Sequence, residues 1–290
     1  MKKIIALILV VAMSLLAFAG CGNTNDVDDN AKKIVVAEEG SAGETVAKTL
    51  EGYDFTAVDT QNKALMEVKS GTADAAIVDY VLSIGSIGEG TDFAELKVNG
   101  DGYSPESYGI AFRKGSDVTN KVNEAIKAIK DNGKLNDIAK KYKLQDLITA
   151  TDSFDAFKQS ETDSDWEYIK NKGELVIGIT YFEPMNYMDE NGKLTGFETE
   201  FAKEVCKRLG VEAEFVEINW DTKETELNSK NIDCIWNGMT ITDERKENMD
   251  ISVAYMENKQ VMVTKAENAS KFTSADALKG ATVVAEKKSA

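Results

Sequence analysis

The segment 232–249, "IDCIWNGMTITDERKENM", joins a strand to the start of a helix. Its apolar run "IDCIW" has the branched and aromatic residues typical of a buried strand. Gly238 and Thr240 follow at the strand end, and "TDERKENM" then predicts a helix that contains Arg245. Open α/β sheets bind ligands beyond the carboxyl ends of their strands, where helix N-termini also point. The segment therefore predicts an α/β fold with a site at this junction.

The same alternation continues on both sides of this segment. Before it, "ELVIGI" predicts a strand, "FETEFAKEVCKRLG" a helix and "EAEFVEI" another strand. Nearer the N-terminus, "KIVVA", "DFTAVD" and "ADAAIVDY" predict strands, and the all-apolar core of the last indicates burial on both faces. Between the two regions lie two helix patterns, "DVTNKVNEAIKAIKDNG" and "KLNDIAKKYKL". Alternating strands and helices predict parallel α/β layers.

The first 21 residues have the layout of a secretory leader. Two lysines precede an apolar run over 4–18, and small residues stand before Cys21. The run is too short to span a membrane. The end of the leader resembles a bacterial lipobox, with Phe18 where that motif usually carries Leu, which implies a lipid anchor on Cys21. Simple secretion with Cys21 as an ordinary residue is the alternative, and both place the protein outside the cytoplasm.

Composition excludes several function classes. The chain has 34 basic and 50 acidic residues, a formal charge of −16, and the leader takes away two further lysines. Such a surface repels nucleic acid. The absence of histidine removes His-dependent triads and most zinc sites, so we expect no cofactor and no metal. Cys206 on a helix face and Cys234 in a strand are expected to be two packed thiols rather than a disulfide.

Several conspicuous residues are expected at strand ends or helix starts, where a ligand would bind. Backbone N–H groups at a helix start suit a carboxylate, an acid suits a cation, and a guanidinium suits bidentate carboxylate capture. Alone, each residue is more often a cap, a solvated side chain or part of the core. Together they describe a site for a molecule with both a carboxylate and an ammonium group, an amino acid. These residues are Ser41, Ala42, Asp79, Tyr181, Phe182, Trp220, Gly238, Thr240 and Arg245.

Three segments resemble a known family. They are "LVIGITYFEPMNYMDENGKLTGFETEFAKEVCKRLG", "IDCIWNGMTITDERKENMDIS" and "YGIAFRKGSDVTNKVNEAIKAIKDNGKLNDIAKKY". They resemble the polar-amino-acid solute-binding proteins of ABC importers, bacterial extracellular family 3, and the resemblance extends over 32–290. It implies a two-lobe periplasmic-binding-protein-like (type II) α/β fold, in which two hinge strands let the lobes close over one free amino acid.

The resemblance also implies roles for individual residues. Arg245 would hold the α-carboxylate with help from amides at Thr240 and Ser41. The α-amino group would lie against Asp79, with Gly238 and Thr240 beside it.

The resemblance also implies that Phe182 and Trp220 would lie on either side of the ligand side chain. Members that take basic ligands often carry an acid where this chain has Thr180, which favours a neutral polar ligand, although Glu183 lies nearby.

The order of the segments departs from the family, whose members run from lobe 1 through lobe 2 and back. The interpretation is a circular permutant, and the alternative is a truncated tandem with 1–148 as a remnant. The expected parts are a signal peptide (1–20), a tether (21–31), lobe 2 (32–112), closing helices of lobe 1 (113–148), a linker (149–164), lobe 1 (165–265), and a hinge exit with the duplicated first strand of lobe 2 (266–290).

One tetrapeptide, "VVAE", occurs at 35–38 and again at 283–286. Two strands cannot occupy one position in a sheet. We expect 34–37 to fill it, because that copy leads directly into the turn and helix of the same lobe. The second copy would then fray, pair at an edge, or enter a second molecule as a swapped strand.

The function expected from the resemblance is a lipid-anchored receptor that delivers an amino acid to an ABC permease, without catalysis. A sensory binding module without a transport role is the first alternative. A dehydratase-like enzyme on the same fold is the second, and it would need a general acid such as Glu38, Glu39 or Glu183.

Overall fold

The computed structural model describes residues 33–35, 46, 53–149, 164–271 and 283–286. All of them belong to the second of two compact units, 32–290. The α-helices are α2 (Gln61–Ser70), α3 (Tyr80–Ser86), α4 (Val118–Asp131), α5 (Lys134–Lys141), α6 (Asp165–Lys172), α7 (Phe197–Leu209), α8 (Lys223–Asn228) and α9 (Asp243–Asn248). Single 3-10 turns are η1 (Gln145–Leu147), η3 (Trp220–Thr222) and η4 (Ala266–Lys271).

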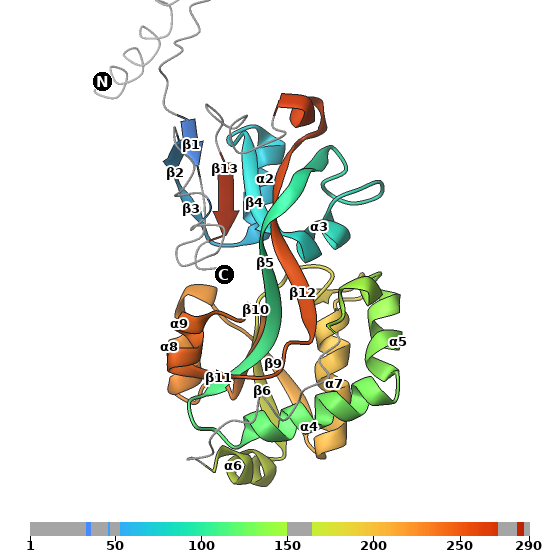
Figure 1. Ribbon diagram of the computed structural model, residues 1–290, viewed down its shortest axis with the longest axis vertical. Helices are drawn as coiled ribbons and strands as arrows, with labels where there is room; N and C mark the ends of the chain where they lie inside the picture. The colour runs from blue at the N-terminus through green and yellow to red at the C-terminus, as the bar shows by residue number, and fades with distance from the viewer. Residues whose placement is uncertain (1–32, 36–45, 47–52, 150–163, 272–282, 287–290) are drawn as a thin grey trace, which may run out of the picture. The chain divides into compact units, whose positions relative to one another are not determined.

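A mixed sheet runs through the unit in the order β3-β13-β4-β12-β5-β10-β6-β9, with β11 also on β5 (Figure 1). β12 pairs antiparallel with β4 and β5, and β10 and β11 pair antiparallel with β5, whereas the outer neighbours are parallel. The bounds are β3 (Ala57–Val58), β4 (Ala75–Asp79), β5 (Leu96–Arg113), β6 (Glu174–Ile179), β9 (Glu212–Glu217), β10 (Cys234–Thr240), β11 (Met249–Ile251), β12 (Met256–Lys265) and β13 (Val283–Glu286).

Two small sheets lie apart from this one. β1 (Lys33–Val35) pairs parallel with β2 (Tyr53–Phe55), and β7 (Tyr187–Met188) pairs antiparallel with β8 (Leu194–Thr195).

The elements form two groups joined by the long strands β5 and β12. In the first group, α2 packs against β4, β12 and β13, and α3 packs against β4 and β12. In the second group, α4 and α5 pack against α7, and β9 also contacts α7. Figure 1 shows β5 and β12 side by side, reaching both groups. Helices that precede the segment 149–164 therefore pack on a helix that follows it. The α/β fold expected from the sequence is confirmed, but the expectation of purely parallel layers is wrong, because both long strands run antiparallel to their partners.

Local sequence explains where the elements begin and end. Thr60 caps α2 by accepting a hydrogen bond from the Lys63 N–H, and Gly71 ends the helix at φ 85°. All five residues of β4 are buried, as its apolar run predicts. Cys206 and Cys234 are buried free thiols, which confirms the expectation for this pair.

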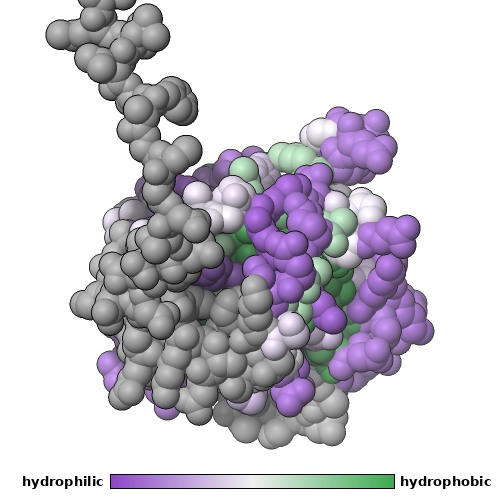
Figure 2. All heavy atoms as spheres, turned by 90° about the horizontal axis from the view of Figure 1, so that it is seen from above, coloured by the Kyte–Doolittle hydropathy of each residue, from purple (hydrophilic) through white to green (hydrophobic). Residues whose placement is uncertain are grey.

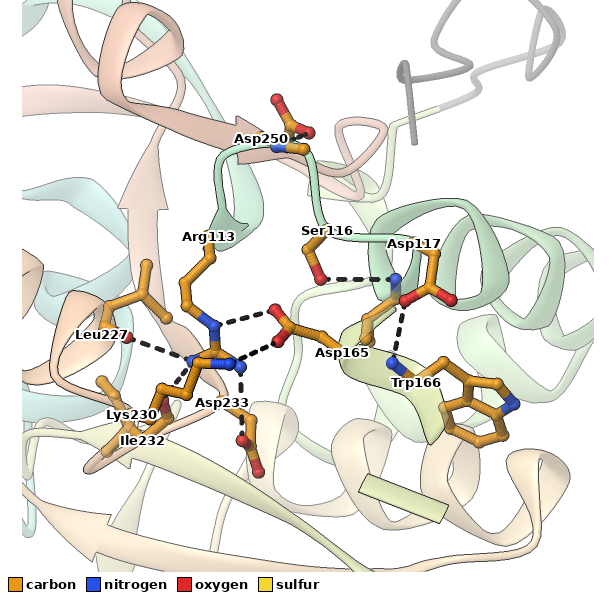
Figure 3. A network of polar contacts seen from close by, with 12 residues as sticks. Arg113, Ser116, Asp117, Asp165, Trp166, Leu227, Lys230, Ile232, Asp233 and Asp250 are labelled. Carbon is orange, nitrogen blue, oxygen red and sulfur yellow. Dashed lines mark hydrogen bonds and ion pairs between the residues drawn. The ribbon is translucent and has the colours of Figure 1, made fainter. Parts of the chain in front are cut away.

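A buried ion-pair network fixes the end of β5 to α6 and to the start of β10 (Figure 3). The Arg113 Nε atom donates to Asp165 at 2.8 Å, and its Nη2 lies 3.5 Å from Asp233. Its Nη1 donates to the carbonyl oxygens of Leu227 and Ile232 at 3.1 and 2.9 Å. The guanidinium is thus the point at which three segments distant in sequence meet.

The expectation that residues 34–37 fill the shared strand position is wrong. β13 lies there, between β3 and β4 and parallel to both, with Val284 beside Ala76 and Ala285 beside Ile77 and Ala57. β1 instead pairs with β2 in its own small sheet. Both copies carry the same four residues, so local propensity does not distinguish them. Chain connectivity to the turn favoured the first copy, but the tertiary structure places the second, which follows β12 and η4, in the sheet.

Some expectations fall on residues outside the described part of the chain. These are the leader with Cys21, the tether, the interior of the segment 149–164, and the turn with Ser41 and Ala42. Among the described helices, none combines the length and apolar character needed to cross a membrane. Seen from above, the described surface is largely hydrophilic, with hydrophobic residues showing between the polar ones (Figure 2).

Candidate functional site

The junction between β10 and α9 is built around Arg245. Thr242 caps the helix by accepting a hydrogen bond from the Arg245 N–H at 3.1 Å. The Arg245 guanidinium is buried, and its Nη1 donates to the carbonyl oxygen of Thr240 at 2.9 Å. This bond holds the guanidinium over the end of β10, next to the backbone of the strand.

Asp79 is the last residue of β4, and three side-chain amides surround its carboxylate. Asn258 and Gln260, both on β12, each donate to Oδ1 at 2.6 Å, and Gln61 on α2 donates to Oδ2. Gln61 also accepts the Asp79 N–H at 2.8 Å. The carboxylate is 5% exposed, and burial raises its pKa, while the amide hydrogen bonds act in the opposite direction. Asp79 is therefore a buried acid held without an ion pair in the described part of the chain.

Glu106 on β5 is a site residue that the sequence analysis missed. Its carboxylate accepts hydrogen bonds from Asn258 at 3.1 Å and from Gln260 at 3.1 and 3.2 Å, the same two amides that bind Asp79. The Thr240 hydroxyl also donates to it at 3.1 Å. Burial, followed by the charge of Asp79, raises the pKa of Glu106 to about 8.

These contacts join the residues into one continuous network from Asp79 to Arg245. Asn258 and Gln260 link Asp79 to Glu106, and Thr240 links Glu106 to Arg245. An acid and a guanidinium expected to bind opposite ends of an amino acid thus lie at the two ends of one network. Asn258 and Gln260 stand two residues apart on one strand, so they share a face; this spacing is a signal that could have identified them.

A third buried acid, Glu198 on α7, binds the backbone of β10 at Gly238. Its Oε1 accepts the Gly238 N–H at 2.8 Å and the Tyr255 hydroxyl, and its Oε2 accepts the Asn186 amide at 2.8 Å. Burial raises the pKa of Glu198 to about 7 against the effect of these hydrogen bonds. The Glu198 carboxylate therefore fixes the backbone of β10 at the Gly238 N–H.

The two aromatic residues expected to sandwich a ligand belong to different clusters of buried residues. Phe182 lies against Gly238, since a Cβ on that glycine would stand 2.9 Å from the Phe182 Cζ atom. Trp220 is buried in a different core cluster with Met239 and Ile235, and the Lys223 Nζ atom lies 4.6 Å from its ring centre.

The two residues before Phe182 belong to the same region. Thr180 exchanges hydrogen bonds with Asn237, at 2.9 Å through its N–H and 2.6 Å through its hydroxyl. Tyr181 is partly buried against the core cluster that contains Phe182. Thr180, Tyr181 and Phe182 are therefore next to the strand that carries Gly238.

Residues 175–287 match the model of the bacterial extracellular solute-binding proteins, family 3. Over 113 residues the chain is 40% identical to the L-cystine-binding protein TcyJ of Escherichia coli strain K12, which is 39% of this chain and 42% of that protein. It is also 40% identical over 114 residues to the L-cystine-binding protein TcyA of Bacillus subtilis strain 168, over 38% and 42% of the two chains. The matched segment thus spans less than half the length of these relatives.

A solved structure of the arginine-bound form of domain 1 from TmArgBP, carrying one substitution, is similar over nearly its whole length. The identity is 33%, and the match includes 39% of this chain and 92% of that one, with a TM-score of 0.31. Over residues 175–287, which include the strands and helices that surround Arg245, the sequence is thus similar to the bacterial extracellular solute-binding proteins, family 3.

Proposed function

We propose that the protein binds a free amino acid outside the cytoplasm for delivery to an ABC importer. The observation that carries this proposal is the network from Asp79 through Glu106 and Thr240 to Arg245, which combines a buried carboxylate and a buried guanidinium. An amino acid offers the complementary ammonium and carboxylate. The curated relatives TcyJ and TcyA are named for binding L-cystine, and domain 1 from TmArgBP was solved with arginine bound.

In the proposed site Arg245 binds the α-carboxylate and Asp79 binds the α-ammonium, with Gly238 and Thr240 beside them. Phe182, Tyr181 and Thr180 line the side-chain end, and Ser41 and Ala42 supply amides from the turn after the first "VVAE". Phe182, which lies against Gly238, and Trp220 are the proposed aromatic contacts of the ligand side chain. A neutral polar side chain remains the ligand class proposed from Thr180.

We further propose the permuted order of the parts given above, with 32–112 as lobe 2 and 165–265 as lobe 1. The position of β13 between β3 and β4 supports this order, because a strand at the far end of the sequence completes a sheet begun by residues near its start. The packing of α4 and α5 on α7 supports the assignment of 113–148 as closing helices. Cys21 is the proposed point of lipid attachment.

A thermal-shift screen against L-cystine and the twenty common amino acids tests the proposed function. A ligand at about a hundred times its dissociation constant should add roughly 2.7 kcal/mol to the free energy of unfolding, which is several degrees for a chain of this size. Arg245→Ala should abolish the shift, because it leaves the ligand carboxylate without its partner.

Arg208→Ala is the matched control, since Arg208 is an exposed residue in the last turn of α7, and it should retain the shift. A cooperative unfolding transition that none of these compounds raises would overturn the proposed function. Equal shifts in both arginine variants would overturn the role of Arg245.

A further inference from the structure

The arrangement of two carboxylates at the crossing of β4, β5 and β12 goes beyond the proposed function. Asp79 and Glu106 share the amide donors of Asn258 and Gln260, so their oxygens lie around the same two side chains. No ion pair in the described part of the chain includes either carboxylate. Two buried carboxylates that share a site do not both ionise readily without a cation.

Within the described part of the chain, two further polar groups at this site are without a hydrogen-bond partner. The Gln260 Oε1 atom makes no hydrogen bond, and Gln260 is 1% exposed. The Tyr108 hydroxyl, which is near enough to both carboxylates for their charges to raise its pKa, is also buried without a hydrogen bond. An unsatisfied buried polar atom is destabilising, so a free acceptor beside two carboxylates indicates a place for a donor.

An ammonium group fits this environment chemically. It offers three N–H donors and one positive charge, and the site offers oxygens of Asp79, Glu106 and Gln260 as acceptors. The pKa of Glu106 is raised to about 8, so at neutral pH in the absence of a cation the pair holds a proton. A cation bound between the carboxylates favours their charged forms and expels that proton.

We propose that the ammonium group of a bound amino acid replaces a proton held between Asp79 and Glu106, so that binding releases one proton. This inference rests on the proposed function and adds Glu106 to its site. The step breaks one carboxyl O–H bond, the proton passes to the buffer, and both carboxylates remain charged beside the ammonium ion. The affinity for the amino acid then depends on pH because of Glu106 on β5.

Other ionisable side chains lie near the pair of Asp79 and Glu106. Tyr108 and Tyr255 are buried, and their pKa values are raised well above the usual range by burial, so they stay neutral. The charge of Glu198 raises the pKa of Tyr108, and the charge of Asp79 raises the pKa of Glu198. Arg245 is linked to Glu106 through Thr240, whose carbonyl oxygen accepts a hydrogen bond from Arg245 and whose hydroxyl donates one to Glu106.

Calorimetric titration with L-cystine, L-glutamine and L-arginine tests the inference. Each titration is repeated in two buffers with different ionisation enthalpies, and the difference gives the protons released per ligand bound. Below pH 8 the apparent affinity should rise as much as tenfold per pH unit, and close to one proton should be released at pH 6 to 7.

Glu106→Gln keeps the side-chain shape but holds no titratable proton. It should bind without that proton release, and its affinity should lose the rise between pH 6 and 8. Glu95→Gln removes a surface carboxylate near Lys69 and should behave as wild type.

Binding by the wild type without proton release, or an unchanged pH profile in Glu106→Gln, overturns this inference alone. Failure of all three compounds to bind overturns it together with the proposed function for these ligands.

Discussion

Gly238 stands where the backbone of β10 passes closest to two aromatic rings. Its φ is 54°, and an added Cβ would meet the Phe182 Cζ atom at 2.9 Å and the Tyr108 ring at 3.3 Å. Gly238→Ala should therefore lower the free energy of unfolding by about 2 to 4 kcal/mol, from overpacking together with the unfavourable φ. Urea denaturation measures this loss.

Gly210→Ala is the control for the backbone contribution. Gly210 has a φ of 78°, but nothing lies within 4 Å of an added Cβ. We expect a loss of about 1 kcal/mol there. Equal losses in the two variants would show that the aromatic rings do not limit the space at Gly238.

Glu198 should make stability depend on pH in a defined direction. Its pKa is about 7 in the folded protein, above that of a glutamate in an unfolded chain. The folded state therefore binds the proton more tightly, and this contribution to stability is complete below about pH 4.5 and is lost as the pH rises through 7. Glu198→Gln cannot lose a proton, so the wild type should lose stability relative to it between pH 5 and pH 8.

Urea denaturation at pH 5, 6, 7 and 8 checks this difference. A gap between the two proteins that stays constant with pH would contradict the assignment. Glu106→Gln measured alongside separates the contribution of the Asp79 and Glu106 pair.

At the scale of elements, the two copies of "VVAE" have different structural positions. β13 pairs on both sides, with β3 and β4, whereas β1 pairs with β2 in a two-stranded sheet. Val284→Pro removes a backbone N–H from a strand with neighbours on both sides and should cost about 3 kcal/mol or more. Val35→Pro in β1 is the control and should cost less than half as much.

Thermal unfolding followed by circular dichroism compares the two proline variants. If Val35→Pro were the more damaging, the first copy rather than the second would hold the position in the sheet.

The Arg113 network joins β5, α6 and β10, so it should matter more than surface ion pairs of the same chemistry. Asp165 is 1% exposed and binds the Arg113 Nε atom at 2.8 Å. Asp165→Asn should lower the free energy of unfolding by about 3 kcal/mol, because it leaves a buried guanidinium with one fewer charge partner. Asp131→Asn removes one partner of an exposed pair with Lys127 and should cost below about 0.5 kcal/mol.

The lowered pKa of Asp165 makes the free energy of unfolding fall as the pH falls, which is the opposite of the effect expected from Glu198. Its pKa is lowered, with burial opposed by hydrogen bonding and charge from Arg113. The stabilisation is present above the unfolded pKa and is lost as the pH falls through the folded one. A loss in Asp165→Asn that is as large in acid as at neutral pH would contradict the ion-pair explanation.

For the whole molecule, the permuted order predicts that the parts can be rearranged. A chain that runs 165–286 and then 39–148 contains "VVAE" once, directly before the turn that carries Ser41. It should unfold in one cooperative transition and bind the same amino acid, because every described strand of the large sheet is retained. Calorimetry and light scattering give its unfolding midpoint and its mass.

Residues 165–290 alone are the control for the tandem alternative. Without β4 and β5 the strand β12 loses both neighbours, so this fragment should not unfold cooperatively. A stable fragment together with an unfolded rearranged chain would favour a remnant at 1–148.

The sequence by itself determined the local elements. Periodicity and composition predicted β4 as a fully buried strand, α4 and α7 as amphipathic helices, and Cys206 and Cys234 as packed thiols, because these features depend on near neighbours in the chain. The expected strand and helix ends drew attention to Asp79 and Arg245, the family resemblance implied their roles, and the structure joins them through one network.

Only the tertiary structure decided which copy of "VVAE" lies in the large sheet and which acids share a site. The two copies have identical local propensity, so contacts with β3 and β4 distinguish them. From the sequence, Glu106 is a charged residue next to an apolar run, which is typical of a surface position. It becomes part of the site because Asn258 and Gln260, more than 150 residues away, bind both Glu106 and Asp79. Pairings of this kind depend on long-range packing, which a one-dimensional pattern does not contain.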